Sequence, residues 1–241
     1  MLPLHDNTPN VHRPHMVRAV IIVNILVFLV ELGLSEQALF YVFHLLGFVP
    51  VRLMHPEWAM THGYPGLGPL PFVSHMFLHS GWLHLIGNMW TLWIFGDNIE
   101  DVMGPFRFLA FYLCCGIAAL MAHVLFNADS AVPVVGASGA IAGVMGAYLV
   151  LYPHAKVVTF FFFFPIFVEI PAALFLGVWF LTQIFSGFSM AQSSNVAWWA
   201  HAGGFVAGIL LLRIFENPRR CLACRSAGKR TQPFWAGPNG S

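Results

Sequence analysis

The sequence predicts an all-α membrane protein built from six transmembrane helices. Of its 241 residues, 58% belong to the hydrophobic set and 9% are charged, whereas charged residues make up about 25% of an ordinary soluble domain. Only Asp129, Lys156 and Glu169 carry a formal charge between residues 108 and 212. So few charges cannot cover a soluble surface, and the 24 Phe and 8 Trp residues are incompatible with a disordered chain. The composition therefore excludes a soluble cytosolic enzyme.

Six hydrophobic segments account for the predicted helices, at residues 17–34, 84–95 with flanks, 106–126, 138–152, 165–185 and 196–215. Several are shorter than the roughly 20 residues that a straight span needs. Short segments suit helices that stop partway or a locally thinned bilayer. The long first connection, about 35–72, contains its own apolar helix near 38–48. The Phe-rich run 157–164 is expected to dip into the lipid.

The distribution of Lys and Arg predicts the orientation in the bilayer. With the N-terminus inside, ten of the 11 basic residues fall on the cytoplasmic side and only Arg52 falls outside. Residues 1–16 are then a cytoplasmic tail in which His5, His12 and His15 are solvated. Residues 17–215 form the membrane domain, and residues 216–241 form a basic cytoplasmic tail that meets anionic lipid.

Two further features concern compartment and partners. The short polar N-terminus lacks a cleavable signal peptide or an Arg/Ser-rich transit segment, which favours a prokaryotic plasma (inner) membrane and leaves an organelle membrane open. Cys221 and Cys224 make at most half of a zinc site, which a cytoplasmic partner could complete. A net charge of +1 argues against a nucleic-acid partner.

Four polar residues inside the predicted spans are candidates for function, because polar groups in a membrane are costly. His84 and Asn88 are four residues apart and share one helix face. Ser138 begins the fourth span and His201 lies early in the sixth. The even-numbered spans all run from outside to inside, so the four residues lie at similar depth in the outer leaflet.

Small residues predict which helices meet. They recur every four residues, as Gly139, Gly143 and Ala147 on the fourth span and as Ala200, Gly204 and Gly208 on the sixth. Such faces let helix backbones approach closely. We therefore expect the fourth and sixth spans to pack together and to bring Ser138 within reach of His201.

A serine beside a histidine is an activated nucleophile, because the imidazole accepts the hydroxyl proton while the oxygen attacks a carbonyl. Ser138 begins a helix, so free backbone N–H groups and the positive end of the helix dipole lie nearby. Asn88 and His84 supply further donors for a negatively charged oxygen. No carboxylate is placed as a third member, and the residues predict a dyad.

These residues resemble a known family, the rhomboid intramembrane serine proteases. The similarity lies in His79-x4-His84-x3-Asn88, in Gly136-Ala137-Ser138-Gly139, and in Ala200-His201-Ala202-Gly203-Gly204 with Gly208, in the family's order from residue 17 to residue 215. Glu100-Asp101, between Gly96 and Gly104, resembles the family's loop after the second helix. The resemblance implies a six-transmembrane-helix rhomboid-like bundle with a water-filled cavity that opens to the outside. It implies cleavage of single-span membrane proteins within the lipid bilayer, without a metal ion, nucleotide or other cofactor.

The resemblance also implies roles for individual residues. Ser138 is the nucleophile and His201 the general base, and His84, Asn88 and the Ser138 amide form the oxyanion hole. His79 is a supporting residue, and the packing glycines are Gly136, Gly139, Gly143, Gly204 and Gly208. Ala142 departs from the family pattern, because many members carry an aromatic residue there that stacks on the base.

Alternatives from other functional classes stay open at this point. A rhomboid-like protein without catalysis could bind and escort membrane proteins. A transporter or proton relay could use His84, His123 and His201, which would then have to span the bilayer. For the protease, the fifth span with its Phe-rich approach is the expected gate for substrate entry. The sequence leaves the oligomeric state open.

Overall fold

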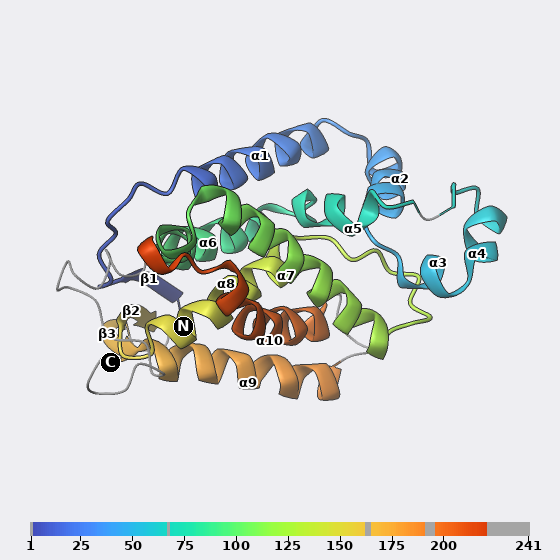
Figure 1. Cartoon of the computed structure of the whole chain (residues 1–241). Coiled ribbons are helices and arrows are strands. Elements are labelled where there is room, and N and C mark those ends of the chain that lie inside the picture. The colour runs from blue at the N-terminus through green and yellow to red at the C-terminus, as the bar shows by residue number, and fades with distance from the viewer. Residues whose placement is uncertain (1, 67, 162–164, 191–195, 221–241) are drawn as a thin grey trace.

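The computed structural model describes residues 2–66, 68–161, 165–190 and 196–220. The Cys221/Cys224 pair and most of the basic tail lie outside these described residues. Within them, six helices correspond to the six predicted spans: α1 (His15–Leu32), α6 (Trp82–Met103), α7 (Pro105–Phe126), α8 (Ser138–Leu151), α9 (Ala172–Met190) and α10 (Trp198–Phe215). They form one bundle (Figure 1), which confirms the predicted class of helical membrane protein.

The six helices differ in length and polarity. Among the described residues, α1, α7, α9 and α10 are long and apolar enough to cross a membrane. Helix α8 has only 14 residues, and nearly all of them are buried among α6, α7, α9 and α10. A helix that is apolar on every side is a core helix, so α8 forms the centre of the bundle. Helix α6 has 22 residues but carries a polar C-terminal half that includes Asn98, Glu100 and Asp101.

The first connection is largely helical. It holds α2 (Glu36–Leu46), α3 (Pro50–Met54), α4 (Pro56–Thr61), α5 (Pro71–Ser74) and the 3-10 turn η1 (His75–Phe77). Helix α2 confirms the apolar helix expected near 38–48. A backbone bridge between Phe48 and Val134 joins this connection to the segment that leads into α8. The connection therefore covers the end of the bundle where α6 and α8 begin.

A small antiparallel sheet lies at the opposite end of the bundle (Figure 1). In the described part of the chain its order is β1 (Leu2–Asp6), β2 (Lys156–Phe161), β3 (Ile166–Pro171), with Val158 opposite both His5 and Glu169. The described part of the run 157–164 forms strand β2, and its expected contact with lipid stays a prediction. The prediction of a fifth span from residue 165 is wrong, because β3 precedes α9. The high content of β-branched and aromatic residues favours strand pairing here over helix.

The N-terminal segment is anchored to the bundle by hydrogen bonds, while His5, His12 and His15 are exposed as predicted. The His12 Nδ1 atom lies 2.5 Å from Asp101 Oδ1, and the Val11 amide donates to Asp101 Oδ2 at 2.7 Å. Glu100 accepts the amides that begin α1, from Met16 at 2.9 Å and Val17 at 2.8 Å. Both acidic residues lie inside α6, so the expected loop at Glu100-Asp101 is instead the last turns of this helix, which bind the segment before α1 and its first turn.

Candidate active site

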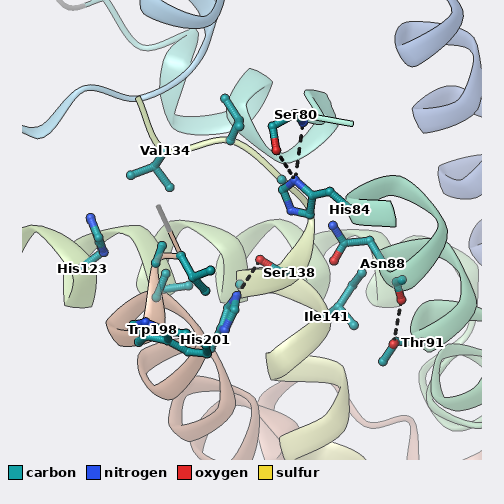
Figure 2. Close-up of a pocket in the computed structure, with 18 of the residues that line it drawn as sticks. Ser80, His84, Asn88, Thr91, His123, Val134, Ser138, Ile141, Trp198 and His201 are labelled. Atoms are coloured by element: carbon teal, nitrogen blue, oxygen red, sulfur yellow. Dashed lines mark hydrogen bonds between the residues drawn. The ribbon is translucent and has the colours of Figure 1, made fainter. Parts of the chain in front are cut away.

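Ser138 and His201 meet as the small residues predicted. Ser138 is the first residue of α8 and His201 lies in the first turn of α10. The two side chains face each other, with His201 Nε2 2.8 Å from Ser138 Oγ (Figure 2). At this distance the imidazole accepts the hydroxyl proton through a normal hydrogen bond. Residues 63 positions apart in the sequence therefore form one unit.

Backbone contact between α8 and α10 positions this pair. A Cβ atom on Gly204 would overlap the carbonyl oxygen of Gly139, and one on Gly208 would overlap that of Gly143. On the other face of α8, a Cβ atom on Gly143 would lie 2.5 Å from the Cβ atom of Cys115 on α7. Any larger side chain would push the helices apart, so the predicted stripe of small residues sets the distance between Ser138 and His201.

The second nitrogen of His201 has a partner that the sequence analysis missed. Gln183 of α9 places Oε1 2.8 Å from His201 Nδ1. The aromatic rings nearest to the imidazole belong to Trp179 and Trp198, with centroids 6.0 and 6.2 Å away. Ala142, where the family often has a stacking aromatic residue, is fully buried. Apart from its hydrogen bond to Ser138, the imidazole is therefore held from α9 and from the start of α10, and not by stacking on a ring of α8.

His84 Nε2 and Asn88 Nδ2 are two N–H donors on the side of Ser138 away from His201. The backbone N–H of Ser80 and its hydroxyl lie 3.4 and 3.1 Å from His84 Nδ1. An N–H can only donate, so Nδ1 is the acceptor and Nε2 carries the proton. The Asn88 Nδ2 group is buried and has no hydrogen-bond partner among the described residues. Figure 2 shows both side chains beside Ser138.

Gly136 allows these donors to approach the nucleophile. Its φ of +119° is one that L side chains rarely adopt, and a Cβ atom there would lie 2.6 Å from His84 Nε2 and 3.7 Å from Asn88 Nδ2. Its N–H donates to the His75 carbonyl at 2.8 Å, which fixes the turn before α8. The Ser138 amide belongs to the first turn of α8 and has no partner within the helix. The His84 and Asn88 side-chain donors therefore lie close to the turn that precedes Ser138, whose own amide is the third donor.

His79 lies behind this group and does not reach the nucleophile. Its ring packs edge-on against His84 at 5.1 Å, and its amide lies 3.3 Å from both carboxylate oxygens of Glu31. Burial lowers the pKa of His79 to about 4, with a further lowering from His84. Burial likewise lowers the pKa of His75 to about 4. Both rings are therefore neutral at pH 7, and the contact supports the position of His84.

A cavity of about 1450 Å³ connects these residues. Its lining includes the four polar site residues together with side chains from α6, such as Ile86 and Trp90, and from α9, such as Phe175 and Trp179. His123 of α7 lines it as well. The three histidines of the relay hypothesis thus share one cavity instead of following one another across the bundle. Among the described residues, no three His, Cys, Asp or Glu side chains are grouped so as to hold a metal ion.

Comparison with known proteins agrees with this geometry. The model of one family, described as the Rhomboid domain, matches residues 69–217. The chain is 29% identical over 159 residues to Rhomboid protein 1, mitochondrial, of Saccharomyces cerevisiae, covering 58% of this chain and 40% of the relative. It is 30% identical over 155 residues to RHOMBOID-like protein 5 of Arabidopsis thaliana, covering 61% and 47%.

A bacterial relative matches a shorter segment. Identity to the Rhomboid protease GluP of Bacillus subtilis is 44% over 72 residues, which is 30% of this chain and 14% of the relative. The chain therefore spans less than half the length of each of these relatives.

Proposed function

The chain belongs to the rhomboid family, and we propose that it is an intramembrane serine endopeptidase that cleaves single-span membrane proteins near the outer face. The observation that carries the proposal is the 2.8 Å contact between Ser138 Oγ and His201 Nε2 beside a group of N–H donors. The nucleophile, its base and the donors for a negatively charged oxygen all line one cavity. Acyl transfer to serine needs these three parts.

The chemistry follows from the positions of the atoms. Ser138 Oγ attacks the carbonyl carbon of the substrate peptide while its proton passes to His201 Nε2. The carbonyl oxygen becomes negative and accepts hydrogen bonds from His84 Nε2, Asn88 Nδ2 and the Ser138 amide. When the C–N bond breaks, the leaving amine takes the proton from His201 and an acyl-enzyme remains. Water then attacks this ester, gives its proton to His201, and Ser138 recovers a proton as the acid product leaves.

Substrate entry is part of the proposal. The cavity lies inside the bundle, and its lining from α6 and α9 consists largely of apolar side chains such as Leu83, Ile86 and Phe175. A substrate must present extended backbone to Ser138, so we expect small or helix-breaking residues near the cleaved bond. Movement of α9 relative to α6 is the proposed route. Engineered cysteines that crosslink α6 to α9 should block cleavage of a membrane substrate, and unchanged cleavage would exclude this gate.

The central test is a cleavage assay in liposomes. The purified protein is incubated with a reporter that carries a transmembrane helix containing Gly and Ala, beside Ser138→Ala and His201→Ala. Product from the wild type alone supports the proposal. Product that persists in Ser138→Ala contradicts it. Binding of the reporter without cleavage by any of the three proteins would favour the rhomboid-like binding and escort function.

The protein is a multi-pass membrane protein. Family membership does not select the membrane, because the relatives include a mitochondrial protein of yeast as well as a Bacillus protein. We carry the prokaryotic plasma membrane as a proposal, with an organelle membrane as the alternative. The cytoplasmic position of both termini is likewise proposed, and the distribution of Lys and Arg supports it. Antibody access to tags at each terminus in intact cells and in opened cells tests the orientation.

A further inference from the structure

We propose that Gln183 is the positioning residue that fixes the tautomer and the orientation of His201. The inference rests on the proposed function, in which His201 is the base. A histidine can accept the serine proton only if Nε2 is unprotonated and the neutral ring carries its proton on Nδ1. Something must therefore select this tautomer and keep the ring turned toward Ser138. No carboxylate does this in the structure, and the 2.8 Å contact from Gln183 Oε1 to His201 Nδ1 does.

The direction of this hydrogen bond follows from the other contacts of Gln183. Its Nε2 group lies 3.1 Å from the Trp179 carbonyl oxygen, which can only accept. The same Nε2 group lies 3.1 Å from Thr182 Oγ1, whose hydroxyl donates to the Trp179 carbonyl at 2.6 Å. Both amide protons of Gln183 are therefore used within α9. The turned-over amide would place two oxygens against each other, so Oε1 must face His201 and accept from Nδ1.

The tautomer of His201 is set by this arrangement. Because Oε1 can only accept, Nδ1 of the neutral ring carries the proton and Nε2 presents its lone pair to Ser138. Gln183 is only 5% exposed, so water competes poorly for this contact. The amide oxygen also stabilises the imidazolium that forms during catalysis, although less than a carboxylate would. Gln183 thus takes the place of the third group that orients a catalytic histidine in other serine hydrolases.

The same contact replaces the restraint on the imidazole that is missing at Ala142, where many family members carry an aromatic residue. An aromatic ring on α8 would restrain the imidazole by stacking, and the methyl group of Ala142 cannot. A hydrogen bond from α9 restrains both the ring angle and the proton position, whereas stacking restrains only the plane. The other titratable groups that act on His201 among the described residues are His84 of α6 and His123 of α7. Neither is a carboxylate, so an amide oxygen is the acceptor available to Nδ1.

The test uses the full-length protein with two variants of Gln183 and a control. Gln183→Met keeps the length of the side chain and removes the acceptor. Gln183→Glu keeps an acceptor and adds a charge. Leu181→Met, at a lipid-exposed position of the same helix, controls for the general effect of a methionine. Each protein is assayed for reporter cleavage between pH 3 and pH 9 and for thermal unfolding in detergent.

We expect Gln183→Met to lower kcat/KM about 10- to 100-fold, since a wrong tautomer costs up to about 10⁴-fold where a carboxylate is replaced and a neutral acceptor contributes less. Gln183→Glu should recover part of the rate, because it keeps an acceptor for Nδ1 but sets its second oxygen against the Trp179 carbonyl. It should move the acid limb of the pH profile to higher pH, because a carboxylate stabilises the imidazolium. Leu181→Met should match the wild type. Equal loss in both Gln183 variants with an unmoved acid limb would reduce Gln183 to a packing residue and overturn the inference.

A second readout separates this inference from the proposed function. The tautomer of His201 is measured by nitrogen NMR on ¹⁵N-histidine-labelled protein, with the His201 signals identified by their loss in His201→Gln. The wild type should show a proton on Nδ1, and Gln183→Met should lose this preference. A proton on Nε2 in the wild type would overturn the inference whether or not the protein cleaves a substrate. A correct tautomer in a protein that neither cleaves nor reacts at Ser138 would instead contradict the proposed function alone.

Discussion

The two ends of the helical bundle both contain polar residues, but these residues are partnered differently. At the end that holds the sheet, the Glu100 carboxylate receives the amides of Met16 and Val17, and the Asp101 carboxylate receives the amides of Val11 and His12. At the other end, the Nδ2 group of Asn88 has no partner among the described residues and faces a cavity.

The presence or absence of a hydrogen-bond partner distinguishes polar groups that stabilise the fold from polar groups that are available for catalysis. A carboxylate whose oxygens accept hydrogen bonds from backbone N–H groups fixes the segment that carries those groups and stabilises the fold. A buried donor that faces a cavity without a partner costs stability, and it is available to a substrate. Polarity alone, which marks both ends in the sequence, does not distinguish the two. Predictions that affect rate at one end and stability at the other test the distinction.

The largest effect is expected for Asn88→Ala. Removal of one donor from an oxyanion hole costs about 2.7–4 kcal/mol of transition-state stabilisation, or about 10²- to 10³-fold in kcat. The melting temperature should not fall, because the Asn88 Nδ2 group makes no hydrogen bond in the described structure. Reporter cleavage and thermal unfolding in detergent measure the two effects. A lower melting temperature with an unchanged kcat would assign Asn88 to the structural class.

Glu100→Ala should have the opposite signature. It leaves the two amides at the start of α1 without their acceptor, and hydrogen bonds to charged groups contribute about 1.5–3 kcal/mol each. We expect a loss of about 3 kcal/mol in the free energy of unfolding, seen as a lower melting temperature, with kcat retained at temperatures where the protein stays folded. Glu100→Gln, which keeps an acceptor, should lose less. A loss of kcat in a fully folded Glu100→Ala protein would contradict the comparison.

Acid pH should lower both the stability and the cleavage rate, through two different histidines that line the same cavity. Burial lowers the pKa of His75 to about 4 from an ordinary value of about 6.5. The unfolded chain therefore binds a proton that the folded chain excludes, so this contribution to stability is complete above pH 6.5 and is lost as the pH falls toward 4. At pH 5 the loss is about 2 kcal/mol from His75.

Protonation of His201 stops it from accepting the serine proton, so the rate also falls on acidification. The rate should fall reversibly while the protein remains folded. The variant His75→Asn should weaken the dependence of the melting temperature on pH and leave the pH dependence of the rate unchanged. A cleavage rate that stays constant from pH 8 to pH 3, in protein shown to remain folded, would exclude His201 as the base.

The smallest effect is expected at the exposed ion pair between β2 and β3. Lys156 Nζ lies 2.7 Å from Glu169 Oε2, and the Lys156 hydrogen bond lowers the pKa of Glu169. Both side chains are more than half exposed, and exposed pairs contribute little because water and salt screen them. Lys156→Ala should leave the melting temperature and kcat within experimental error. A clear drop in the melting temperature would show that the sheet depends on this pair.

The helices and the central pair could be predicted from the sequence because their signals are local. Long apolar runs predict spans, and small residues at four-residue spacing predict the contact between α8 and α10. The sheet was missed because the apolar run 157–170 was interpreted by hydrophobicity alone. Its β-branched residues, including Val157, Val158 and Thr159, favour strands, and Pro165 interrupts the run six positions after Thr159.

The sequence analysis missed Gln183 in the site and the partners of Asp101 at the opposite end, for different reasons. Gln183 was overlooked although it is polar inside an apolar helix, and the rule that identified His84 and Asn88 applies to it equally. The partners of Asp101 could not be predicted, because the contact joins His12 to a helix 89 positions later in the sequence. Such long-range contacts depend on the packed fold and leave no periodic signal in the sequence.

Reaction of Ser138 with a fluorophosphonate probe tests the central claim most directly, because it requires the nucleophile and its base but no membrane substrate. The folded wild-type protein is incubated with the probe, and the labelled residue is located by mass spectrometry, beside His201→Ala and Glu100→Gln. The account predicts a label on Ser138 in the wild type and in Glu100→Gln, and its loss in His201→Ala. A folded wild-type protein whose Ser138 stays unlabelled, or a label that persists without His201, would contradict it.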